Sequence, residues 1–196
     1  MSKIRKETQS QRINIENHSY WSQIRMQILD RSAYNELILK NYSFYRIIEK
    51  ELKDKLDKEQ SPLIFKNRKL RSTILEDDII QIGLENIAES IILPGKVEIH
   101  NFYEALGVLY SIEDISLLNI MFKKDLDLNK SISQQKLNFF DNLNHNVSQN
   151  WTTVTQLIEE YCDSYEKTKQ LIEKSNDTFR FYNKLLNTDL FLQEAF

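Results

Sequence analysis

Residues that carry acid–base, nucleophilic or metal chemistry are few in this chain of 196 residues. It has three histidines, His18, His100 and His145, and a single cysteine, Cys162. A metal site needs several ligands at a spacing that places them on one face. None of the histidines has a carboxylate at such a spacing. We therefore predict no metal site, no Ser-His-Asp or Cys-His arrangement and no firm catalytic residue.

Two other features that resemble chemical sites favour a structural interpretation. Glu76, Asp77 and Asp78 are consecutive, and adjacent residues of a helix point in different directions, so we expect a solvated face. Cys162 is expected to be a part-buried thiol within a helix. A lone cysteine also excludes an internal disulfide.

Glycine and proline are unusually scarce. The chain has three glycines and two prolines, whereas average usage would place roughly 12% of residues in these two types. Sandwiches, barrels and doubly wound sheets use both at their turns. Gly83, Gly95 and Gly107 are also too far apart to form a phosphate-binding loop. The composition therefore predicts an all-α fold.

Charge and hydropathy exclude several classes of partner. The net charge is −3 and the isoelectric point is near 5.7, which argues against nucleic-acid binding. No apolar run approaches the roughly 18 residues of a membrane span, and the basic N-terminus lacks the apolar core of a signal peptide. We expect a cytoplasmic protein that binds neither nucleic acid nor a membrane.

Hydrophobic periodicity and turn residues predict the helices. We expect a first helix over 8–16, a capped turn at 17–19, and a long helix that follows Asp30 as N-cap, carries an apolar stripe from 34 to 56 and ends at Ser61-Pro62. Lys40 and Glu49 fall on its other faces. Further helices are expected over 67–83, 101–125, 131–141, 146–175 and 177–186, with a loop at 93–95. No repeat or linker interrupts the chain, so we expect one domain over 1–196.

The order of several motifs is similar to that of a known family. Residues 104–113, EALGVLYSIE, closely resemble the A-L-G-x-L-Y-V-L-E entry into the distal helix of bacterial biliverdin-producing heme oxygenases. Residues 4–8, IRKET, resemble their opening segment, and 67–70, NRKL, resemble their basic helix start. The resemblance runs along the whole chain and implies a heme-oxygenase-like helical bundle.

The positions that hold heme in that family carry different residues here. The family's T-x-x-x-H motif supplies the proximal histidine, but the residue four positions after Thr8 is Arg12. A guanidinium stays protonated and has no lone pair for iron. Asp114, Leu118 and Asn119 stand where the family has three distal glycines. The resemblance leaves three residues for a vestigial pocket: Arg5, Tyr110 and Glu113.

Three functions stay open at this point. The first is a degenerate heme-oxygenase-like pseudoenzyme that binds an unknown protein or small-molecule partner, with no cofactor expected. The second is a divergent heme oxygenase that still binds and opens heme through a non-standard ligand. The third is a helical protein that uses the same fold for other small-molecule chemistry. Whether the chain is an enzyme is therefore undecided by the sequence.

The substitutions also predict a specific contact. An unpaired buried guanidinium is costly, and a carboxylate partner offsets much of that cost. We expect the first helix to lie across from the helix over 107–121, and Arg12 to pair with Asp114, Glu113 or Glu16. In the competing interpretation, Arg12 turns to solvent and the pocket stays open.

Overall fold

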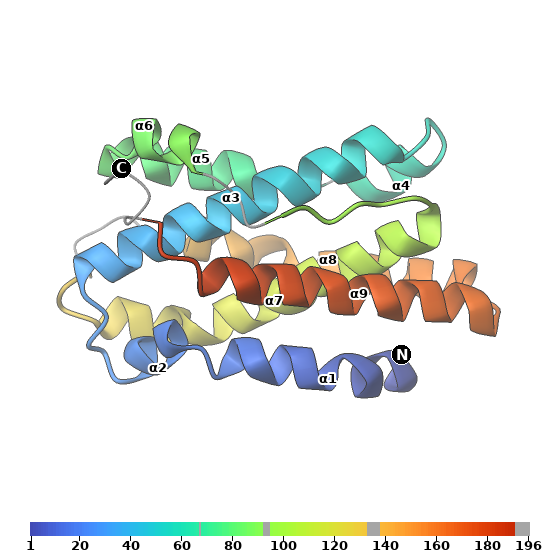
Figure 1. Cartoon of the computed structure of the whole chain (residues 1–196), viewed down its shortest axis with the longest axis horizontal. Helices are drawn as coiled ribbons and strands as arrows, with labels where there is room; N and C mark the ends of the chain where they lie inside the picture. Colours follow the sequence, from blue (N-terminus) through green and yellow to red (C-terminus); the bar gives the residue numbers. More distant parts are fainter. Residues whose placement is uncertain (67, 92–94, 133–137, 191–196) are drawn as a thin grey trace.

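The computed structural model describes residues 1–66, 68–91, 95–132 and 138–190, and this part of the chain is helical without any strand. The elements are α1 (Ser2–Glu16), α2 (Ser19–Arg25), α3 (Arg31–Lys55), α4 (Gln60–Phe65), α5 (Arg71–Ile82), α6 (Glu85–Ser90), α7 (Phe102–Leu128), α8 (Asn138–Tyr161) and α9 (Tyr165–Leu186). Figure 1 shows that the long helices run roughly along the long axis of the molecule. The predicted all-α fold is confirmed.

Helix α7 lies at the centre of the bundle between α8 and α9. It is apolar around most of its circumference, as expected for a helix enclosed by others. Length and composition alone would allow it to cross a membrane, but 83% of its apolar 18-residue window is buried inside the protein. Gly107 permits the closest approach, because a Cβ at this position would overlap the carbonyl oxygen of Leu171 in α9.

Helix α3 has the predicted apolar stripe. Tyr34, Leu37, Ile38, Tyr45, Ile48 and Leu52 are all buried. Lys40 and Glu49, expected on the other faces of this helix, are buried as well. The Lys40 ammonium donates to the Tyr20 hydroxyl at 2.9 Å and to the carbonyl of Leu186 at the end of α9 at 2.8 Å.

Several helix ends agree with the sequence, and others do not. Asp30 caps α3 by accepting from the backbone N–H of Ala33. His18 caps α2 through Nδ1. Ser61-Pro62, expected to end the long helix, instead lies inside α4.

The C-terminal boundaries were also placed wrongly. Helix α8 runs without interruption through 142–145, and the break before α9 falls at 162–164. Cys162 therefore lies in a connection rather than in a helix, and it is half-buried as expected. The expected helix over 131–141 and the loop at 93–95 fall partly outside the described residues.

Helix α1 begins at Ser2, six residues earlier than the periodicity indicated, and packs along α9. Figure 1 places α1 along the lower face of the bundle, below α9. Its side chains therefore reach α7 from outside the bundle, and this arrangement creates the site described next.

Candidate functional site

Arg12 of α1 reaches across to α7 as the sequence predicted. Its Nε atom lies 3.2 Å from a carboxylate oxygen of Asp114 and 3.0 Å from one of Glu16. The Asp114 side chain is only 6% exposed, whereas that of Arg12 is 36% exposed. The guanidinium thus joins the two helices at the edge of the bundle, with one carboxylate on each of them.

Burial dominates the electrostatics of Asp114. Loss of solvation raises the pKa of this carboxyl above its ordinary value, and the positive charges of Arg12 and Arg5 oppose the shift. A buried carboxylate facing one half-exposed guanidinium is incompletely compensated. The pair therefore closes the space between α1 and α7 without being a strongly stabilising ion pair.

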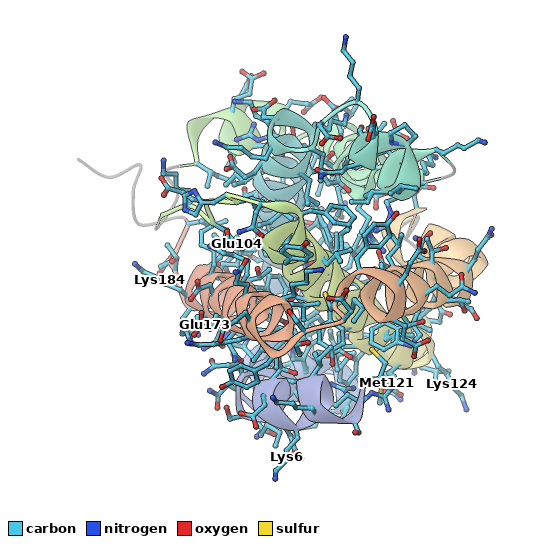
Figure 2. The ribbon with its side chains drawn as sticks, turned by 90° about the vertical axis from the view of Figure 1, so that its right-hand side faces the viewer. Lys6, Glu104, Met121, Lys124, Glu173 and Lys184 are labelled. Carbon is cyan, nitrogen blue, oxygen red and sulfur yellow. The ribbon has the colours of Figure 1, made fainter. Side chains whose placement is uncertain are left out.

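A cavity of about 350 Å³ remains beside this contact. It is lined by Arg5, Lys6, Thr8, Gln9, Arg12 and Tyr110. The structure thus brings together Arg5, Arg12 and Tyr110, as the sequence suggested. Lys6 extends from the outer side of α1 away from the bundle (Figure 2), so it forms the rim of the cavity.

An aromatic side chain of α8 completes this region. The centres of the Trp151 and Tyr110 rings lie 5.4 Å apart. The Arg5 guanidinium lies 5.8 Å from the centre of the Trp151 ring. Burial is the main reason why the pKa of the Tyr110 hydroxyl is raised. The site therefore combines fixed positive charge with aromatic surface and a protonated phenol.

Glu113, expected in the same pocket, lies elsewhere. Its carboxylate is fully buried and binds the guanidinium groups of Arg68 and Arg71, the latter at 2.6 Å. One residue along a helix changes the direction of a side chain by about 100°, which separates Glu113 from Asp114. The assignment of Glu113 to the vestigial pocket was therefore wrong.

Sequence reasoning missed the polar cluster around Glu113. Glu49 of α3 accepts from the backbone N–H groups of Arg71 and Ser72 at the start of α5, at 2.7 and 3.1 Å. A carboxylate at a helix N-terminus is favourable because it satisfies otherwise unpaired N–H groups. The available signal is the presence of Arg68 and Arg71 three residues apart, of which Arg68 belongs to the segment 67–70 that resembles a family motif.

Leu118 and Asn119, the other two positions on the distal helix, are buried and do not line the cavity. Asn119 is fully buried, and neither its amide oxygen nor its amide nitrogen has a hydrogen-bond partner in the structure. They therefore add volume to α7 where the family motif has glycine.

The three histidines and Cys162, the remaining candidates for chemistry, do not form a catalytic or metal-binding group within the described residues. His18 is a helix cap, His100 is exposed, and the backbone at His145 belongs to α8 rather than to a loop. Burial raises the pKa of the Cys162 thiol to about 11. Within the described ranges no group of His, Cys, Asp and Glu side chains is placed to hold a metal ion.

Asp78 is a correction to the expected solvated face of 76–78. Glu76 and Asp77 are exposed, but Asp78 is buried. Its Oδ2 accepts from the backbone N–H of Phe139 at 2.8 Å. This carboxylate therefore anchors the start of α8 to α5.

The chain folds into a helical bundle in which the Arg12–Asp114 contact joins the first helix to the central helix, beside a cavity of about 350 Å³. A family model described as heme oxygenase matches residues 1–98, half of the chain. The chain belongs to the heme oxygenase family. No curated protein matches it. The matched half contains α1 and Arg12, and α7 lies beyond it.

Proposed function

We propose that this protein is a single-domain heme-oxygenase-like binding module that has lost heme oxygenation. The observation that carries the proposal is the position of Arg12, whose guanidinium lies between Glu16 and Asp114. Arg12 occupies the place in T-x-x-x-H where the resemblance puts the iron-binding imidazole. A permanently protonated guanidinium donates hydrogen bonds but offers no lone pair to a metal.

The opposite wall supports the same conclusion. Glycines in a distal helix let a bound group approach the backbone closely, because no Cβ intervenes. Here Asp114 places a carboxylate on that wall, and Leu118 and Asn119 fill the adjoining interior. The residues present therefore do not fit a heme held between α1 and α7.

What remains suits recognition rather than redox chemistry. The cavity is lined by basic and polar side chains on one wall and a phenol on the other. A small molecule or a protein segment that contacts this opening is the expected partner. No cofactor is part of the proposed function.

A hemin titration of the purified protein tests the proposal. We expect no sharp Soret band at one equivalent and no biliverdin after a reductase is added. The matched variant combines Arg12→His with Asp114→Gly, Leu118→Gly and Asn119→Gly, which restores an imidazole and the three distal glycines of the family motif. We expect this variant to acquire a Soret band characteristic of axial histidine.

The opposite result would favour the alternative function. A stoichiometric Soret band in the unmodified protein, with biliverdin formed on reduction, would identify a divergent heme oxygenase with a non-standard ligand. Repeating the titration with Arg12→Gln would then show whether heme binding depends on the Arg12 guanidinium, because the variant removes the charge and its ion pairs.

A further inference from the structure

A second cavity lies between α4 and α8, apart from the opening beside α1. Its volume is about 250 Å³, and no residue lines both cavities. The lining residues are Pro62, Leu63, Ile64, Lys66, Arg68, Gln149, Asn150 and Thr153. This set does not belong to the site derived above, and nothing in the proposed function uses it.

The polar part of this lining favours an anion. Lys66 and Arg68 contribute positive charge, Gln149 and Asn150 contribute amide groups, and no carboxylate is among the lining residues that the structure describes. Lys66 is exposed and has no ion pair within the described part of the chain. A negatively charged ligand would thus meet two cations and side-chain N–H donors, with no opposing acid in the wall.

Arg68 makes the cavity more than a surface patch. Its side chain is only 4% exposed, and its NH1 group is held by Glu113. The hydrogen on Nε has no acceptor in the structure. Buried guanidinium groups ordinarily satisfy their donors, so Arg68, a residue of the cavity lining, keeps capacity for a further acceptor.

The neighbouring carboxylates of Glu113 and Glu49 do not accept from the Nε hydrogen of Arg68. Glu113 is shared between Arg68 and Arg71. Glu49 is engaged by the backbone at the start of α5 and by the hydroxyl of Ser72. Neither oxygen of Glu49 is therefore directed to Arg68, and the guanidinium keeps its capacity for an additional acceptor.

The other wall is apolar. Pro62, Leu63 and Ile64 come from a single turn of α4 and are the apolar residues of the lining, which also includes polar residues of α8. A ligand that fits both walls needs one anionic end and one short aliphatic end. The cavity volume of about 250 Å³ lies just below the roughly 300–1,000 Å³ of drug-sized sites, which favours a small ligand.

We infer that the α4–α8 cavity binds a small aliphatic monocarboxylate, with its carboxylate at Lys66 and Arg68 and its tail against Pro62, Leu63 and Ile64. The inference does not rest on the proposed function, because the two sites share no residue. Butyrate is the probe, and its affinity is expected on the order of 1 mM given its few atoms.

The test is a ¹H–¹⁵N NMR titration of the full chain with butyrate at constant ionic strength. We expect saturable shifts at Gln149, Asn150 and Lys66. Butyramide, which keeps the tail but lacks the charge, and inorganic phosphate, which lacks the tail, should each bind at least about tenfold more weakly. Equal or tighter binding of either compound would overturn the assignment.

Variants locate the binding within the cavity. Asn150→Asp places a negative charge in the lining without changing side-chain size, and should weaken butyrate binding by about tenfold or more. Lys66→Gln should weaken it by about fivefold. Both changes are on residues whose side chains take no part in the buried Glu113 cluster, so the fold is retained.

Matched controls keep charge and helix constant. Ser148→Asp adds the same charge to the same helix outside the lining, and Lys69→Gln removes a neighbouring exposed positive charge. Both should bind butyrate within about twofold of the unmodified protein. The proposed site would be refuted if the control variants weakened butyrate binding as much as the cavity variants do. It would also be refuted if butyrate caused no saturable shifts in the unmodified protein.

Discussion

Glu113 and Asp114 are adjacent on α7, are both buried, and bind arginines that belong to different parts of the fold. Glu113 binds Arg68 and Arg71 next to α5, whereas Asp114 binds Arg12 of α1. Neighbouring residues on α8 divide in the same way. Asn150 lines the α4–α8 cavity, and the Trp151 ring lies near Tyr110. Helices α7 and α8 therefore separate the polar site around Arg12 and Asp114 from the polar residues around Glu113 and the α4–α8 cavity.

The first prediction contrasts the two carboxylates. Glu113→Gln leaves two buried guanidinium groups without their shared partner, and should lower the free energy of unfolding by about 3–5 kcal/mol. Asp114→Asn should change it by less than about 1 kcal/mol, because its partner Arg12 is partly solvated. Urea unfolding measures both values. Equal losses in the free energy of unfolding of the two variants would show that Arg68 and Arg71 do not need the Glu113 carboxylate to remain buried.

The second prediction concerns pH. Burial raises the pKa of Asp114, so the folded state binds this proton more tightly than the unfolded state, whose pKa is about 3.9. The associated stability is present below that value and is lost as pH rises through the folded pKa. Asp114→Asn removes this loss. Its stability relative to the unmodified protein should therefore increase across this window and then stay constant.

Arg12 supplies the control for that titration. Its positive charge opposes the shift of Asp114, so Arg12→Gln should raise the pKa of Asp114 further. Carboxyl NMR of the Asp114 side chain measures the change directly. A lower pKa in Arg12→Gln would mean that the ion pair does not act on this carboxyl.

Contacts set by local spacing could be predicted from the sequence, whereas contacts between distant segments could not. The periodicity of α3, the Asp30 cap and the Arg12 pairing follow from local spacing or from a charge that must find a partner. Lys40 binds a carbonyl 146 residues away, and Asp78 binds a backbone N–H 61 residues away. Only tertiary packing brings such distant partners together. The helical periodicity of the sequence therefore places Lys40 and Asp78 on the polar faces of their helices and gives no sign that they are buried.

Side-chain direction explains the error within the candidate site. Arg5, Arg12, Tyr110 and Asp114 were placed together correctly because each follows a family motif position. Glu113 was included because it is adjacent to Asp114, but the helical rotation turns it toward Arg68 and Arg71. The α4–α8 cavity had no signal in the sequence, because its walls come from segments that only the fold brings together.

The third prediction concerns the contact between α7 and α9. Gly107→Ala places a methyl group against the carbonyl of Leu171, and rigid backbone on both sides prevents easy relief. We expect a loss of about 2–4 kcal/mol in the free energy of unfolding. Gly83→Ala is the comparison, because Gly83 has a positive φ of 71° but nothing near the added methyl group.

The comparison separates strain from overlap. Gly83→Ala should cost only about 1 kcal/mol, the penalty of a left-handed backbone for a residue with a Cβ. Thermal unfolding should therefore rank Gly107→Ala as clearly less stable. If Gly83→Ala were the more damaging change, the close approach of α7 and α9 would not be a principal constraint on the bundle.

The fourth prediction compares two fully buried asparagines. The Asn41 side chain donates to the carbonyl of Leu37 at 2.9 Å and accepts from the Tyr182 hydroxyl at 3.0 Å. The side-chain amide of Asn119 has no hydrogen-bond partner among the described residues. Replacing an unpaired buried amide with an apolar side chain of similar size removes its desolvation cost, so Asn119→Leu should raise the free energy of unfolding by about 1 kcal/mol. Asn41→Leu should lower it by about 1–3 kcal/mol, because the Tyr182 hydroxyl loses its acceptor. Urea unfolding at neutral pH distinguishes the two, and a loss of stability in Asn119→Leu would show that this amide is hydrogen-bonded in solution.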